Sequence, residues 1–160
     1  MAPTQSCHVP PPGGRPRLSD AGWLIAFGLR GFARLVRARL AFARFEVRDI
    51  VARNKRADKM VGGSVTATDP ALVARIAYVI PRISARLPWR SDCVIQAMAA
   101  QDWLADHGLA SEIRIGVEGT TTGKFGAHAW LVHHGEIVTG GDVERYEVLL
   151  GSAERGAQDA

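Results

Sequence analysis

The chain has 160 residues, of which 47% are apolar and 22% are charged. This length and composition are typical of one globular domain and exclude collagen-like, mucin-like and acidic disordered chains. The two cysteines, Cys7 and Cys93, stand in surroundings too different to predict a disulfide. The N-terminus has no apolar signal region, and no run approaches the roughly 18 apolar residues of a membrane span. We therefore expect a cytoplasmic protein with no membrane partner.

Positive charge is concentrated in one region of the chain. Residues 15–60 contain 12 lysine and arginine residues against 4 acidic residues, whereas the whole chain has a net charge of +4. A pI near 9.6 is compatible with nucleic-acid binding. However, the sequence has no zinc-finger spacing, no RNP motif and no basic strand interleaved with aromatic residues. We expect no nucleic-acid partner.

Three segments are expected before residue 70. Residues 1–17 are rich in proline and are expected to form a disordered tail. Residues 18–60 are expected to form a basic helical region, weakened at Gly28 or Gly31. Residues 61–69 are expected to be a glycine-rich linker.

Arginines recur at helical spacing within the basic region. They are Arg30, Arg34, Arg37, Arg44 and Arg48, and the apolar residues Ile25, Phe32, Leu35, Val36, Phe42 and Ile50 fall largely on the opposite side. Three interpretations remain open for this amphipathic segment. It packs on the domain with solvated arginines, it docks a partner protein, or it lies on a lipid surface.

Two helices are expected after the linker. Asp69 caps a helix over residues 70–80, which should end or kink at Pro81, because proline cannot donate the helical hydrogen bond and clashes with the preceding turn. A second helix is expected over residues 92–107, where Gly108 supplies the left-handed stop.

Three strands are expected after these helices. Alternating apolar side chains over residues 113–117 predict a strand, and residues 127–133 and 137–140 predict an antiparallel hairpin. Helices followed by a small antiparallel sheet predict an α+β core over residues 70–150. Residues 151–160 have no periodicity and are expected to fray.

Three side chains in this order of elements could carry chemistry. Cys93 lies in the first turn of a helix, where the partial positive charge of unpaired amides favours thiolate over thiol. His128 lies on a strand and could accept the thiol proton, and Asp142 could fix the tautomer of the imidazole. This combination indicates nucleophilic attack on acyl carbon.

Whether His128 can contact Asp142 depends on the register of the hairpin. A two-residue turn at residues 134–135 points Asp142 to the wrong face of the sheet. A three-residue turn at residues 134–136, or a bulge at residues 140–141, shifts the register by one residue and places Asp142 opposite His128. We predict that one of these two devices is present.

Each of these residues also has a structural explanation. Cys93 could be a small buried hydrophobe, His128 a core histidine and Asp142 a turn residue. A metal site is a further alternative, because His133 and His134 are also ligand types. The sequence has no Cys-x-x-Cys or His-x-x-x-His spacing, so we expect no metal and no cofactor.

Two runs of the sequence resemble a known family. LPWRSDCVIQAMAAQDWLADHGLASEIRIGV and FGAHAWLVHHGEIVTG are similar to the transglutaminase-like leader peptidases of lasso-peptide biosynthesis, which are papain-like cysteine peptidases. The resemblance covers about residues 71–149. It implies Cys93 as the nucleophile and His128 as the general base and acid. It also implies Asp142, or alternatively Glu144, as the orienting acid.

The resemblance also implies partners. The basic N-terminal region is similar to the helices of stand-alone members and does not resemble the winged-helix recognition domain of fused members. We therefore expect a precursor leader peptide, a separate leader-recognition protein and an ATP-dependent lasso cyclase as partners. Arg34 and Arg37 are expected to dock the recognition protein or the leader, while Trp89, Lys124 and Phe125 are expected to contact substrate.

The expected function is therefore cleavage of the leader through a thioester on Cys93. Two rivals remain open. One is a non-catalytic module that keeps the fold and binds partners through its basic helix. The other is an acyltransferase, in which an amine replaces water in the attack on the thioester.

Overall fold

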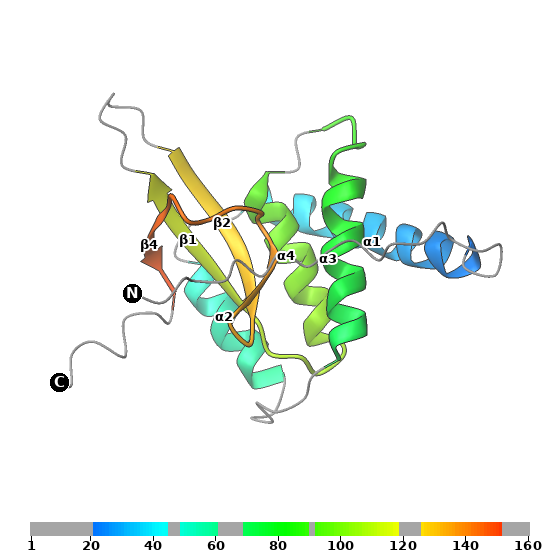
Figure 1. Cartoon of the computed structure of the whole chain (residues 1–160), viewed down its shortest axis with the longest axis horizontal. Coiled ribbons are helices and arrows are strands. Elements are labelled where there is room, and N and C mark those ends of the chain that lie inside the picture. Colours follow the sequence, from blue (N-terminus) through cyan, green and yellow to red (C-terminus); the bar gives the residue numbers. More distant parts are fainter. Residues whose placement is uncertain (1–20, 45–48, 61–68, 90–91, 119–125, 152–160) are drawn as a thin grey trace, which may run out of the picture.

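The computed structural model describes residues 21–44, 49–60, 69–89, 92–118 and 126–151, and these form an α+β fold (Figure 1). The described helices are α1 (Ala21–Phe42), α2 (Asp49–Met60), α3 (Pro70–Ser84) and α4 (Cys93–Ala105). The described strands are β1 (Glu112–Glu118), β2 (Gly126–His133), β3 (Glu136–Thr139) and β4 (Glu147–Leu150). The tail expected at 1–17, most of the linker at 61–69 and nearly all of the fraying end at 151–160 lie outside the described residues.

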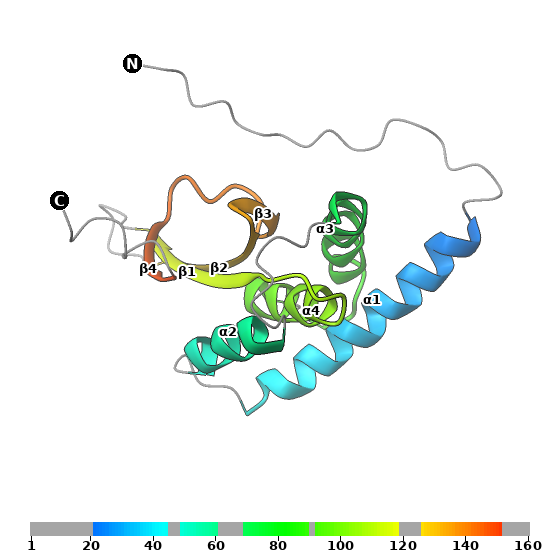
Figure 2. The ribbon, with the colours of Figure 1, turned by 90° about the horizontal axis from the view of Figure 1, so that it is seen from below.

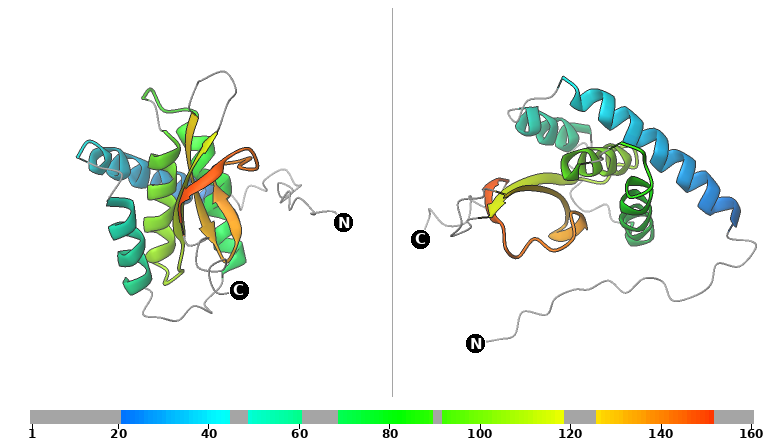
Figure 3. Two further views of the ribbon diagram at one scale, coloured as in Figure 1. Left: turned by 90° about the vertical axis from the view of Figure 1, so that its left-hand side faces the viewer. Right: turned by 90° about the horizontal axis from the view of Figure 1, so that it is seen from above.

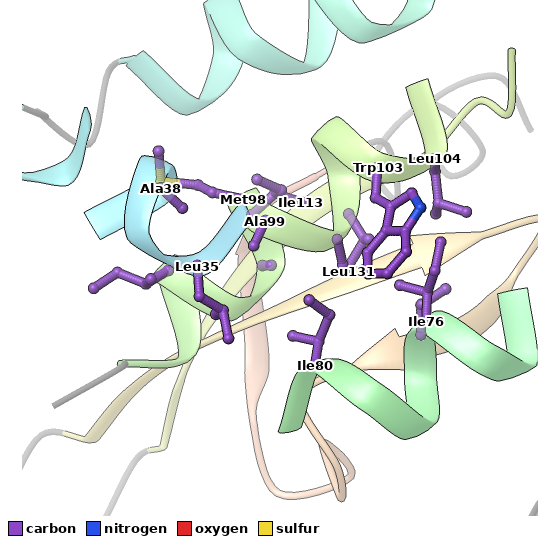
Figure 4. Packing of buried hydrophobic residues seen from close by; sticks show 14 of the residues in the cluster. Leu35, Ala38, Ile76, Ile80, Met98, Ala99, Trp103, Leu104, Ile113 and Leu131 are labelled. Carbon is purple, nitrogen blue, oxygen red and sulfur yellow. The ribbon is translucent and has the colours of Figure 1, made fainter. Parts of the chain in front are cut away.

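Helix α4 lies at the centre of the fold and contacts the other three helices as well as β1, β2 and β3. Figure 2 shows α2 and α4 on one side of the sheet, and the connection from β3 to β4 arching over the other side. Because neighbours surround α4, its Trp103 and Leu104 are fully buried. They pack with Ile76 and Ile80 of α3 and with Leu131 of β2 (Figure 4).

Helix α3 begins as predicted and ends later than predicted. The Asp69 carboxylate accepts a hydrogen bond from Leu72 N at 3.0 Å, and Pro70 occupies the first turn. The expected break at Pro81 is wrong, because the helix continues to Ser84. Pro81 lies in the last turn, where its missing N–H removes a single helical hydrogen bond and the remaining bonds of the turn still form.

The predicted start and stop of helix α4 are confirmed. It begins at Cys93, directly after its N-cap Asp92. It is followed by Gly108, which has a φ of 70°. Leu109 N donates to Leu104 O at 3.0 Å, and the Leu109 side chain is buried, as expected for a helix that closes on a left-handed glycine.

The sheet has the strand order β3-β2-β1-β4, and all three pairings are antiparallel. The three predicted strands are confirmed. Strand β4 was not predicted, although Glu147 and Leu149 are exposed and alternate with half-buried Val148 and Leu150. It pairs with residues 115–117 of β1.

Helix α1 continues through Gly28 and Gly31 without interruption, so the expected weakening produces no break there. Gly31 is instead needed for packing. A Cβ on Gly31 would lie 2.9 Å from Ile83 Cδ1 and 3.0 Å from Val79 Cγ1 of α3. The missing side chain therefore lets α1 and α3 approach closely.

The apolar residues of α1 fall on two faces, which corrects the expectation of one apolar side. Leu35 and Ala38 are buried, whereas Ile25 is 63% exposed and Phe32 is 43% exposed. Figures 2 and 3 show α1 running along the side of α3 and α4 that faces away from the sheet. Among the described residues, no helix is both long enough and apolar enough to cross a bilayer.

Candidate active site

Cys93 occupies the first turn of α4, as predicted, and is half-buried. The N-cap Asp92 has an extended backbone and makes no side-chain capping hydrogen bond to the helix. The first amides of an α-helix have no partner within the helix. The side chain of the N-cap therefore leaves the first-turn amides around the thiol available to an incoming oxygen.

Strand β2 meets the thiol where β3 has separated from it. The β2–β3 pairing ends at Leu131 and Thr139, so Ala129 has no pairing partner on β3. Ala129 N donates a hydrogen bond to Cys93 Sγ at 3.3 Å. An N–H donor binds a charged acceptor more strongly than a neutral one, so this contact is more favourable for thiolate than for thiol.

The Cys93 thiol is thereby brought to the part of β2 that carries His128, although the two segments are far apart in the sequence. The residue that contacts the thiol directly follows His128 on β2. The His128 ring makes its own hydrogen bond elsewhere, from Nε2 to the carbonyl oxygen of Gly140 at 2.7 Å. A carbonyl oxygen only accepts, so Nε2 carries the proton and Nδ1 of the neutral ring is left with its lone pair.

Two aromatic rings lie close to the imidazole of His128. The His128 ring stacks on Tyr146, with ring centroids 4.8 Å apart, and lies 6.2 Å from the Trp130 ring. Tyr146 belongs to the segment that arches over the sheet before β4 (Figure 2). Arg145 lies over the same tyrosine, and its hydrogen bond with Tyr146 raises the pKa of the guanidinium above its ordinary value.

Gly140 is the residue that presents the carbonyl to His128. Its φ is 119°, in the region that favours glycine. A Cβ on Gly140 would lie only 2.3 Å from Trp130 Cβ. Both the backbone conformation and the close approach to Trp130 therefore require glycine at this position.

The expected contact between His128 and Asp142 is not found among the described residues. The hairpin has the two-residue turn at 134–135, and the predicted one-residue shift occurs at a bulge between Ile137 and Thr139 rather than at Gly140. Pairing ends there, before Asp142 can come opposite His128. Asp142 is exposed, and its Oδ1 accepts a hydrogen bond from the backbone of the alternative candidate Glu144 at 3.1 Å.

The other predicted contact residues lie elsewhere. Trp89 contacts Phe32 of α1, with ring centroids 6.1 Å apart. Arg34 forms an ion pair with Asp106 at the C-terminal end of α4, which lies about 18 Å along the helix from Cys93. Arg37 is exposed. Lys124 and Phe125 lie outside the described residues.

A metal centre finds no support in this geometry. Within the ranges that the structure describes, no three His, Cys, Asp or Glu side chains are grouped as a metal site requires. The ring of the buried His133 instead bonds to the carbonyl oxygen of Ala110 at 2.6 Å.

Comparison with protein families gives one match. A family model described as the transglutaminase-like superfamily matches residues 32–151, a stretch that contains Cys93, His128 and Gly140. No curated protein and no solved structure matches the chain. Proteins of this superfamily are typically cysteine-protease-like or acyltransferase-like. Because the match spans most of its length, the chain belongs to the transglutaminase-like superfamily.

Proposed function

We propose that this chain is a cysteine peptidase that removes the leader from a ribosomally made lasso-peptide precursor. One observation carries the catalytic part of the proposal. Cys93 Sγ, in the first turn of α4, lies 3.3 Å from the backbone nitrogen that directly follows His128. The choice of a lasso precursor as substrate rests on the resemblance of the two sequence runs around Cys93 and His128.

The reaction would proceed in two acyl-transfer steps. His128 Nδ1 accepts the thiol proton, and the Cys93 thiolate attacks the carbonyl carbon of the last leader residue. The peptide C–N bond breaks while the imidazolium returns its proton to the leaving amine. Water, deprotonated by the same imidazole, then attacks the thioester, releases the leader as a carboxylate and restores the thiol.

The oxygen of the tetrahedral intermediate needs hydrogen-bond donors. The backbone amide of Cys93 is in the correct part of the helix to be one of them, and one well-placed donor lowers the barrier by roughly 3–4 kcal/mol.

The orienting group in this proposal is the carbonyl of Gly140 rather than the carboxylate of Asp142. The bond from His128 Nε2 to that carbonyl, at 2.7 Å, fixes the same tautomer that a carboxylate would fix. A carbonyl carries no full charge, so it stabilises the imidazolium less than a carboxylate would. Ring orientation and tautomer are therefore its main contributions.

The proposed partners follow from the products. Cleavage frees the amino terminus of the core peptide, and a separate ATP-dependent cyclase would join that amine to a side-chain carboxylate. A separate leader-recognition protein would present the precursor, because the basic helices of this chain do not resemble a recognition domain.

The direct test is cleavage of a precursor. Short reading frames beside the gene supply candidate precursors, and each would be incubated with the full chain, with and without the neighbouring recognition protein. Mass spectrometry should find two fragments whose masses sum to the mass of the precursor plus one water. Cys93→Ala and His128→Asn should abolish them, and Cys7→Ala should not.

Two outcomes would favour the rivals. An acyl product formed with an added amine, at the expense of the hydrolysed leader, would identify an acyltransferase. No turnover of any precursor, with Cys93→Ala still supporting maturation in the producing cell, would identify a non-catalytic binding module.

A further inference from the structure

Helix α1 carries an apolar stripe that the rest of the described structure leaves exposed. The stripe comprises Ile25, Leu29, Phe32, Val36 and Leu40, and is called the outer stripe below. Its successive spacings of four, three, four and four residues place all five side chains on one side of the helix. Ile25, Leu29 and Leu40 are each more than 60% exposed.

The outer stripe is separate from the face that α1 packs on the domain. That inner face carries Gly31, Leu35 and Ala38, all of them buried. Exposed apolar residues scattered singly are normal, but a continuous line over four helical turns marks an interaction site. We therefore expect the outer stripe to bind a partner.

The positive charge of α1 restricts the kind of partner that can cover the outer stripe. Helix α1 contains four arginines and no acidic residue. Arg30 and Arg34 reach Asp106 of the domain. Arg37 and Arg39 are exposed at the two borders of the outer stripe, and neither has an ion-pair partner within the ranges described. A partner that covers the stripe would meet unpaired positive charge on both sides.

The chain itself offers no complementary occupant. Residues 1–20 are rich in proline and carry more arginine than acid, and residues 152–160 contain no large apolar residue. The segments 45–48, 61–68 and 119–125 are too short to form a helix that covers a stripe of about 22 Å. A second copy would bring one arginine-bordered stripe against another, and like charges would then oppose each other.

We infer that the outer stripe docks a helix of another protein, with apolar side chains along one face of that helix and acidic side chains at its borders. The first four stripe residues have the alternating four and three spacing by which helices pair in coiled coils. A contact over four turns is small, so the complex is expected to be weak and transient.

The outer stripe is also connected to the segment that leads to the nucleophile. The Phe32 ring lies 6.1 Å from the ring of Trp89, which precedes Cys93 by four residues. A helix bound at Phe32 would therefore lie close to Trp89, four residues before α4 begins. Docking itself does not depend on the proposed peptidase activity.

A binding experiment with defined probes tests the inference. The probe is a labelled synthetic helix of about 21 residues, with leucines at coiled-coil spacing and glutamates at their borders. A matched peptide carries lysine in place of every glutamate. Fluorescence anisotropy would measure the binding of both peptides to the full chain at low ionic strength.

The acidic peptide should bind at least about tenfold more tightly than the lysine peptide. Combining Leu29→Gln with Leu40→Gln should weaken its binding at least about tenfold, since apolar anchors dominate such contacts. Both leucines are exposed, so the melting temperature should not fall. Leu149→Gln, at an equally exposed leucine on β4, is the matched control and should leave binding unchanged.

Several results would overturn the inference. Equal binding of the two peptides, or no binding of the acidic peptide up to about 1 mM, would remove the acidic helix as occupant. Binding to phosphatidylglycerol vesicles, abolished by the leucine variant and accompanied by no peptide binding, would make the outer stripe a lipid-binding face. A concentration-dependent dimer in sedimentation, lost in the leucine variant, would assign it to a second copy.

Discussion

The Nε2 atom of His128 lies 2.7 Å from the carbonyl oxygen of Gly140, at a position where the backbone and a neighbouring tryptophan both require glycine. In the neutral ring, this bond places the proton on Nε2 and the lone pair on Nδ1. In the proposed reaction, Nδ1 would take the proton of the thiol without any contribution from a carboxylate.

Replacing Gly140 should impair catalysis more than replacing its neighbour. Gly140→Ala introduces a Cβ 2.3 Å from Trp130 Cβ and disfavours the φ of 119°. Displacing the carbonyl frees the imidazole to adopt the wrong tautomer, so we expect kcat for hydrolysis of p-nitrophenyl acetate to fall at least about tenfold. Circular dichroism would establish that the variant is folded.

Gly141→Ala is the matched control for this substitution. Gly141 also has a positive φ, 67°, but a Cβ there meets nothing within 4 Å. We expect some loss of stability and a kcat within about threefold of the parent. If both variants lose activity equally, backbone strain in the turn explains the loss, and the Gly140 carbonyl has no special role.

Asp142→Asn should change activity little. The carboxylate is exposed, and it accepts a hydrogen bond from the Glu144 backbone, which an asparagine oxygen can also accept. We expect kcat within about threefold of the parent. A fall of about a hundredfold would mean that Asp142 reaches His128 during the reaction and would restore the carboxylate to the site.

The sequence was sufficient to predict the elements whose ends depend on local chemistry. The cap at Asp69, the start of α4 at Cys93 and the stop at Gly108 are all confirmed. These features depend on backbone amides and on one or two side chains close in sequence. Alternation over residues 113–117 likewise predicted the strand, although Ile113 and Gly116 are buried and Ile115 and Val117 are only half-buried.

Contacts between distant segments were not predictable in the same way. The partner of His128 is a backbone carbonyl, which every residue possesses, so no residue type could indicate Gly140. The position of the bulge near Val138 depends on how β3 pairs with β2. The two apolar faces of α1 differ only in what packs on them, so periodicity alone could not separate them.

Reversing the charge of Arg34 should destabilise the fold rather than affect a partner alone. Arg34 forms an ion pair with Asp106 and joins α1 to the end of α4. Arg34→Glu places two carboxylates together and should lower the free energy of unfolding by about 1 kcal/mol. Arg37→Glu, at an exposed arginine on the same helix, is the control and should leave it unchanged. Urea unfolding of both variants would measure the difference.

Asn54→Ala should destabilise the junction of α2, α4 and β1. The Asn54 amide donates to Ile113 O and accepts from Ile113 N, both at 3.0 Å, and its oxygen also accepts from the buried Gln101. Alanine removes the partner of both backbone groups of Ile113, while Gln101 keeps its hydrogen bond to Ser111 O, so we expect a loss of about 2 kcal/mol in the free energy of unfolding. Asn54→Asp, which keeps the acceptor, should lose less; an equal loss would show that the acceptor contributes nothing.

Alkylation should distinguish the two cysteines. At about pH 6, iodoacetamide should modify Cys93 faster than Cys7, because the helix amides and Ala129 N favour the reactive thiolate. Peptide mapping by mass spectrometry would give both rates. His128→Asn should slow the reaction at Cys93 alone, and equal slow labelling of the two thiols would contradict an activated nucleophile.

The proposed function depends above all on acyl transfer by Cys93 and His128 together. Time-resolved mass spectrometry of the intact protein, mixed with p-nitrophenyl acetate, tests it most directly. We expect an acetyl group to form on Cys93 and to disappear by hydrolysis, with both steps slowed at least about a hundredfold in His128→Asn. An acetyl group that forms on Cys93 at the same rate without His128, or that forms only on other residues, would contradict the account.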